Sequence, residues 1–293
     1  MNVLLTIFLL LISMPLTASA QQGQKPRSSL IRAQTREVER RLSAMGYWTG
    51  AVDGVFDPAT RSALVAFQKW EGREVTGRLT LEELEAIRNR ADAKDKEGWP
   101  RAREAGYAHV EVDLDRQVLL IVDDQGEDSA GRSRSLTGGV RVLPVSTGTG
   151  KPFMDDGQMS IAYTPRGRFV VYDKTVGWEK PPFTSMYYPN YISGGVAIHG
   201  YRSVPNQPAS HGCIRIPLFA ARELSKQMEL GTIVLVYDEA SFVSGREWAE
   251  NPELRKAALV NSASTEYTYR RQRAKPRSVV IKKARSKGVR AGY

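Results

Sequence analysis

The sequence is poor in the residues that disulfides and structural metals use, with one cysteine and three histidines in 293 residues. A single cysteine excludes an internal disulfide framework, and no Cys-x-x-Cys pair is present to indicate a structural zinc site. Long uncharged apolar runs are equally scarce, and the one at residues 3–16 is shorter than the roughly 20 residues that a membrane-spanning helix needs.

Small residues follow this run, and Ala18 and Ala20 place a cleavage point before Gln21. The pattern predicts a secretory signal peptide at residues 1–20 and export of the body to the periplasm or cell wall. Because no Lys or Arg precedes the run, which is atypical of signal peptides, an uncleaved membrane anchor remains the alternative.

Acidic residues are absent between residues 270 and 290, where ten Lys and Arg residues occur. These ten equal the formal net charge of the whole chain, +10, so the remainder is close to neutral. The basic character therefore belongs to a tail that its composition predicts to be disordered. In an exported chain we expect this tail to meet anionic wall polymer or a membrane surface, or merely to be solvated, and we expect no nucleic-acid partner.

What the sequence does contain is its only cysteine, Cys213, close to His199 and His211. Free cysteine is largely protonated at neutral pH and needs a base, and imidazole is well suited to take that proton. Gly200 and Gly212 allow sharp backbone turns and close approach of amide N–H groups to a developing oxyanion. The set predicts acyl transfer through a thioester on Cys213.

Two structural interpretations compete with this chemistry. A lone cysteine is commonly a small buried hydrophobe. Alternatively, Cys213, His199, His211 and His109 could bind zinc, although no second cysteine is present. In an oxidising compartment an unpaired cysteine is either buried or reactive, and the adjacent Gly212 favours the reactive thiol. We therefore expect no metal and no organic cofactor.

Helical periodicity dominates the first third of the chain. Residues 21–34 are polar and predict a linker, and apolar residues then recur at helical spacing over residues 35–90, with capping signals at Asp57 and Thr80. This predicts a small module of three helices. The charged residues 91–106 predict a connector.

A periodicity of two follows and predicts a mainly β domain over residues 107–238, with a C-terminal extension at residues 239–293. The expected strands cover residues 109–114, 117–122, 140–146, 168–172, 193–198 and 232–237. We expect a loop at residues 123–139 and one helix from Pro217 to Gly231. A helix packed on paired strands predicts a sandwich-like domain.

Aromatic residues and prolines gather in residues 175–191, just before the strand that leads to His199. Long irregular segments beside a reactive site often form a lid or one wall of a substrate groove, and we select Tyr188 as the candidate substrate-binding residue. The alternative is a surface loop held together by its own aromatic side chains.

Three segments resemble known families. His199-Gly200 followed by Ser-His-Gly-Cys-Ile-Arg at residues 210–215 is similar to the signature of the L,D-transpeptidases, the cysteine enzymes that cross-link peptidoglycan. The Thr-Pro-x-Gly-x-Phe segment at residues 164–169 resembles the same family, and this resemblance covers roughly residues 107–238. Residues 42–68 are similar to the peptidoglycan-binding repeat found beside many wall enzymes.

The resemblance implies a sandwich-like catalytic domain that acts on peptidoglycan stem peptides. Cys213 would attack a tetrapeptide stem between its third residue and the terminal D-alanine, with His199 as general base. An amine of a neighbouring stem would then accept the acyl group, which gives a 3→3 cross-link. Carbapenems would acylate the cysteine, as they do in this family.

The resemblance also assigns supporting roles around the cysteine. The backbone N–H groups near Gly212 and Cys213 would stabilise the oxyanion, and Gly212, Gly200, Ser210 and His211 would shape the oxyanion site and the pocket. Arg215 would bind a substrate carboxylate or brace the loop.

Other activities fit the same residues. With water as acceptor the enzyme would be an L,D-carboxypeptidase, and with a protein amine it would attach protein to the wall. A noncatalytic peptidoglycan-binding protein is the alternative from a different class, and the retention of both histidines, both glycines and the cysteine argues against it.

Overall fold

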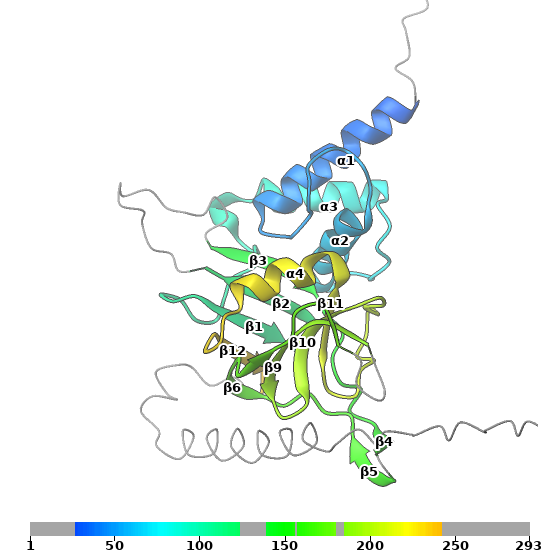
Figure 1. Cartoon of the computed structure of the whole chain (residues 1–293). Helices are drawn as coiled ribbons and strands as arrows, with labels where there is room; N and C mark the ends of the chain where they lie inside the picture. The colour runs from blue at the N-terminus through cyan, green and yellow to red at the C-terminus, as the bar shows by residue number, and fades with distance from the viewer. Residues whose placement is uncertain (1–26, 124–138, 156, 180–184, 242–293) are drawn as a thin grey trace, which may run out of the picture.

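The computed structural model describes residues 27–123, 139–155, 157–179 and 185–241 (Figure 1). The signal peptide expected at residues 1–20, most of the loop expected at residues 123–139 and the basic tail lie outside these residues. Within them, no helix has both the length and the apolar character that crossing a membrane requires.

The N-terminal module is helical, as predicted. Its helices are α1 (Arg27–Ala44), α2 (Pro58–Trp70) and α3 (Leu81–Ala91). Two of them begin at the predicted capping residues. The carboxylate of Asp57 accepts from the Thr60 N–H at 2.8 Å, and the hydroxyl of Thr80 accepts from the Glu83 N–H at 3.2 Å.

Helix α1 begins earlier than the sequence pattern indicated. It starts at Arg27, so residues 27–34 of the linker expected at residues 21–34 are helical. Residues 31–34 are exposed, whereas Thr35 is 2% exposed and begins the packed part of the helix. Hydrophobic periodicity reports only the packed face of a helix, which explains the difference.

The connector after α3 is folded against the module. It includes a short 3-10 helix, η1 (Lys94–Lys96). The indole N–H of Trp99 donates to Arg90 O at 3.0 Å, and that of Trp70 donates to Gly98 O at 2.9 Å.

Two sheets form the β domain that follows the connector. The first has the order β3-β2-β1-β12-β6, and its strands are β1 (His109–Asp113), β2 (Val118–Val122), β3 (Val140–Pro144), β6 (Gly167–Val170) and β12 (Ile233–Tyr237). The predicted hairpin around Asp115 and Arg116 is confirmed, since β1 and β2 pair antiparallel, while β12 lies parallel to β1.

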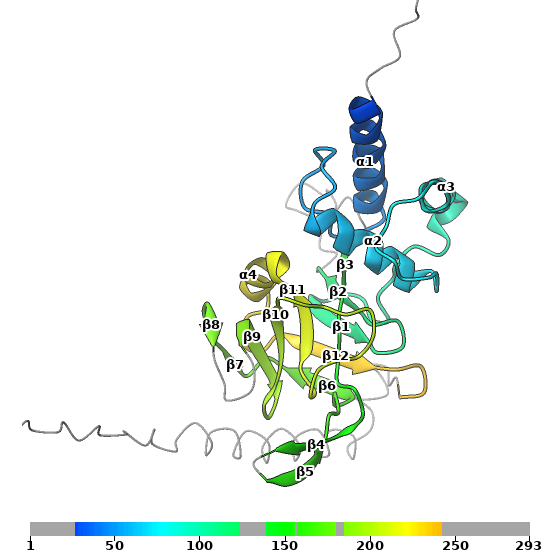
Figure 2. The same cartoon turned by 90° about the vertical axis from the view of Figure 1, so that its right-hand side faces the viewer.

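The second sheet carries the candidate site. Its order is β11-β10-β9-β7, and its strands are β7 (Asp173–Lys174), β9 (Met186–Ser193), β10 (Val196–Tyr201) and β11 (Ile214–Pro217), with β8 (Trp178–Glu179) paired to β9. A separate hairpin of β4 (Pro152–Asp155) and β5 (Gln158–Ile161), which the sequence did not predict, projects at the end of the molecule away from α1 (Figure 2).

Strand β9 corrects the interpretation of the aromatic run at residues 175–191. Residues 186–191 of this run belong to β9, which lies between β10 and β7, so this part of the run is neither a lid nor a surface loop. Pro189 within this strand has no N–H to donate, but its carbonyl accepts from the Thr175 N–H at 3.1 Å.

The sheets and one helix enclose the main core. Helix α4 (Leu218–Gln227) begins close to the predicted start and packs on β9, β10 and β11. Ile198, Ile214 and Leu224 are fully buried there. The predicted architecture of a helical module followed by a mainly β, sandwich-like domain is confirmed.

A second core joins the module to the first sheet. Tyr47 and Phe67 meet edge to face at 5.8 Å and share a buried cluster with Leu120 and Val142. The backbone N–H of Val142 donates to Gly46 O at 2.8 Å, so the chain after α1 also pairs with β3. Strand β2 is buried at every residue because the helices cover one face of the sheet and the second sheet covers the other.

Candidate active site

Strand pairing brings the two predicted reactive residues to one face of the second sheet. Strands β10 and β11 are parallel, with His199 opposite Arg215. Cys213 immediately precedes β11 and packs against Ala197 of β10. Ala197 and His199 flank Ile198, which points into the main core, so Cys213 lies on the same face of the sheet as His199 and Arg215. Ile198 and Ile214 point the other way into the main core.

The imidazole of His199 is held in one tautomer. Its Nδ1 lies 3.0 Å from Gly200 O, and because a carbonyl only accepts, Nδ1 carries the proton. Burial lowers the pKa of His199 to about 4; the nearby Arg215 charge adds to this shift and the bond to Gly200 opposes it. At neutral pH the ring is therefore uncharged, with the Nε2 lone pair available as a base.

The thiol of Cys213 is a donor in the resting site. Its Sγ lies 3.5 Å from Gly195 O. Burial raises the pKa of the thiol, while a backbone hydrogen bond from Ala197 and the charge of Arg215 pull it down. The thiol of Cys213 and the imidazole of His199 are thus both uncharged, and proton transfer has to accompany attack on a substrate.

The loop that joins β10 to Cys213, residues 202–212, is fixed by its own polar groups; we call it the active-site loop. The Ser210 hydroxyl donates to Cys213 O at 2.6 Å and accepts from the Gly212 N–H at 3.0 Å. The Thr164 hydroxyl donates to Gly212 O at 2.7 Å. These bonds hold the backbone immediately before and at the cysteine.

Gly212 is required at its position. Its φ of +145° is one that side-chain-bearing residues rarely adopt, and a Cβ there would lie 2.8 Å from Tyr163 O. Its N–H, expected to face an oxyanion, is directed at Ser210. Of the two N–H groups expected to stabilise an oxyanion, those of Gly212 and Cys213, the first therefore has another partner in this structure.

Two other predicted residues, Arg215 and His211, contact aromatic side chains. The Arg215 guanidinium covers the Tyr201 ring at 4.3 Å. His211 is exposed and packs on Phe153 of the β4–β5 hairpin at 4.5 Å between ring centroids.

Tyr188, selected as a substrate-binding residue, contacts Tyr187 edge to face at 4.7 Å and packs against the main core. The aromatic residues clustered with Cys213 are instead Tyr172 and Tyr191. Tyr191 lies in the aromatic run at residues 175–191, but the sequence could not single it out because its position depends on the register of β9.

The histidines considered as zinc ligands are separated in the fold. His109 lies in β1 of the first sheet, where its Nε2 is 3.0 Å from a carboxylate oxygen of Glu111. Among the described residues, no three His, Cys, Asp or Glu side chains gather as a candidate metal site.

Comparisons with known proteins agree with this architecture. Residues 32–87 match a family model of a peptidoglycan binding domain, and residues 107–236 match the model of the L,D-transpeptidase catalytic domain. No curated protein matches the sequence.

Solved structures of L,D-transpeptidases match different shares of the chain. An L,D-transpeptidase from Xylanimonas cellulosilytica is 34% identical with a TM-score of 0.58, and the match covers 70% of this chain and 93% of that one. An L,D-transpeptidase from Stackebrandtia nassauensis is 20% identical (TM-score 0.37; 69% and 90% covered). The catalytic domain of the E. faecium enzyme is 25% identical (TM-score 0.33; 46% and 99% covered). The chain belongs to the L,D-transpeptidase family.

Proposed function

We propose that the chain is an exported cysteine L,D-transpeptidase that acts on peptidoglycan tetrapeptide stems through a thioester on Cys213. The observation that supports this most strongly is the fixed tautomer of His199, whose bond to Gly200 leaves Nε2 as a base on the face that carries Cys213. The family membership and the peptidoglycan-binding module support the substrate class.

Acylation begins when His199 Nε2 takes the thiol proton as Sγ attacks the carbonyl carbon of the third stem residue. The tetrahedral oxyanion needs donors, and the Cys213 N–H is our candidate because that of Gly212 binds Ser210. The C–N bond then breaks, and D-alanine leaves with the proton that His199 returns. A thioester remains on Cys213.

Deacylation reverses these roles. The amine of a neighbouring stem attacks the thioester and gives its proton to His199. The C–S bond breaks, the thiolate recovers that proton, and a 3→3 cross-link is formed. Water in place of the amine gives the carboxypeptidase reaction from the same thioester.

The test is incubation of residues 21–293 with disaccharide tetrapeptide, followed by mass spectrometry of the products and of the protein. We expect release of D-alanine, a cross-linked dimer and an acyl adduct on Cys213, and no products from Cys213→Ala. Release of D-alanine without dimer would establish the carboxypeptidase instead. If the wild type, like Cys213→Ala, forms no products, the proposal is refuted.

A further inference from the structure

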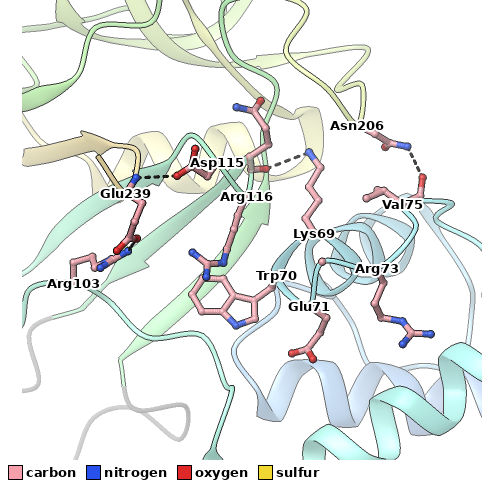
Figure 3. Close-up of a pocket in the computed structure, with 12 residues that line it drawn as sticks. Lys69, Trp70, Glu71, Arg73, Val75, Arg103, Asp115, Arg116, Asn206 and Glu239 are labelled. Carbon is pink, nitrogen blue, oxygen red and sulfur yellow. Dashed lines mark hydrogen bonds and ion pairs between the residues drawn. The ribbon is translucent and has the colours of Figure 1, made fainter. Parts of the chain in front are cut away.

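A buried lysine of the helical module reaches into the catalytic domain. Lys69, in the last turn of α2, is 7% exposed, and its Nζ lies 2.8 Å from Val145 O and 3.2 Å from Gln117 O. Both carbonyls belong to the first sheet's connections. Figure 3 shows the amine directed at this backbone, in a cavity of about 970 Å³ where the module meets the sheet.

Gln117, which receives this bond, has an unusual backbone conformation. Its φ is +54°, a region that a residue with a side chain enters at a cost of about 1 kcal/mol or more. Its side chain holds the turn: Nε2 donates to Leu114 O and to Thr147 Oγ1, each at 2.8 Å, and Oε1 accepts from the Thr147 N–H at 3.1 Å. The position of Thr147 is thus tied to Gln117.

Thr147 in turn holds the active-site loop. Its carbonyl accepts the N–H groups of Ala209 and Ser210, each at 2.9 Å. Ser210 then donates to Cys213 O at 2.6 Å. A continuous series of bonds therefore runs from Lys69 through Gln117, Thr147 and Ser210 to the cysteine, and all four of these side chains are less than 10% exposed.

The module also touches the active-site loop directly. On the other side of the same cavity, the amide of Asn206 donates to Val75 O at 2.5 Å (Figure 3). The loop is thus contacted by the module at Asn206 and held through the bonded series at Ser210.

The chemistry of Lys69 argues against a role in packing alone. Burial lowers the pKa of Lys69 to about 8, because its surroundings disfavour the charged ammonium form that lysine has in water. A methionine of similar length would fill the space without that penalty. What an amine adds is donors to two carbonyls that the catalytic domain supplies.

We propose that Lys69 is a positioning residue for Cys213, through which docking of the helical module sets the geometry of the active-site loop. The inference rests on the proposed function of Cys213. Under this proposal the helical module contributes to catalysis independently of any binding to peptidoglycan.

The test compares carbapenem acylation of full-length Lys69→Met, Thr147→Val and the double variant by intact mass, with unfolding followed by circular dichroism. Thr147→Val removes the hydroxyl that accepts from Gln117 Nε2 and changes no residue of the module. It therefore still tests the inference if Lys69→Met does not fold. Leu84→Ala is the control, because it weakens the module core outside the bonded series.

We expect the limiting acylation rate to fall roughly tenfold in each single variant, with the half-saturating concentration little changed, because small misplacements of a nucleophile are costly. The double variant should lose little more, since both changes weaken the same series of bonds. Leu84→Ala should lower the unfolding midpoint and leave the rate unchanged.

Wild-type rates in folded Lys69→Met and Thr147→Val, or rates that merely follow the unfolding midpoint across all variants including Leu84→Ala, would overturn the inference. If the carbapenem leaves wild type unmodified, the proposed function fails separately. The inference is then tested by the rates of iodoacetamide alkylation of Cys213 in the same variants.

Discussion

At the scale of single residues, the surroundings of His199 and Cys213 set the pKa of each side chain. Arg215 lies opposite His199 in the strand pairing, and its positive charge lowers the pKa of both His199 and Cys213. This gives Arg215 a role beyond the two that the sequence suggested, substrate binding or bracing of the loop.

Removing this charge should change the pH dependence of the thiol. In Arg215→Gln the pKa of Cys213 should rise, so its alkylation by iodoacetamide should become slower at pH 7 and its rate profile should move to higher pH. Arg215→Lys keeps the charge and should resemble wild type. Identical profiles for wild type and Arg215→Gln would show that Arg215 exerts no electrostatic effect on the thiol.

Sequence alone could select Cys213 and His199 as candidates but could not place them relative to each other. Residue types and glycines predicted the chemistry, whereas the shared face depends on the parallel register of β10 and β11. Tyr188 was chosen from an aromatic run by composition, and its role in substrate binding stays a prediction. The strand that contains it places Tyr191 in the cluster with Cys213, which composition could not indicate.

At the scale of elements, the contact between β10 and α4 keeps the His199 backbone in place. Gly200 supplies the carbonyl that holds the imidazole, and a Cβ at this glycine would lie 2.6 Å from Ala221 Cβ on α4. The close approach of strand and helix is therefore possible only with glycine at position 200.

Gly200→Ala should force α4 away from the sheet and lower the free energy of unfolding by about 1–3 kcal/mol. The matched control is Gly195→Ala in the same region, where an added Cβ meets nothing within 4 Å. Chemical denaturation measures both variants. Equal stability of the two alanine variants would contradict the packing we describe.

Elements with strong local signals were the predictable ones. Caps at Asp57 and Thr80 marked α2 and α3, and alternation marked the β1–β2 hairpin. Strand β9 was missed because Pro189 and its aromatic neighbours hide the alternation that strands usually show. The β4–β5 hairpin, largely exposed, has no buried face to create a pattern.

At the scale of the whole molecule, the helical module and the catalytic domain share a core. Phe67 of α2 is fully buried in the cluster that also contains Leu120 and Val142 of the first sheet. Neither the sequence periodicity nor the family resemblance indicated this docking, because both describe each module by itself. The arrangement predicts that the two parts unfold together.

Phe67→Ala should therefore destabilise the catalytic domain as well, by about 3–5 kcal/mol. Hydrogen exchange measured by mass spectrometry should show reduced protection in β10 as well as in α3. Val52→Ala, at an exposed site of the module, is the control. Loss of protection confined to the helices would show that the module is an independent unit.

The central claim is that Cys213 is the nucleophile and His199 its base, and intact mass after incubation with a carbapenem tests it most directly. Residues 21–293 should gain one adduct, which Cys213→Ala should lose. His199→Ala should acquire it slower by roughly 10²–10⁴-fold, the usual contribution of a general base. An unmodified wild type whose Cys213 is also inert to iodoacetamide would contradict the account and favour a noncatalytic wall-binding protein.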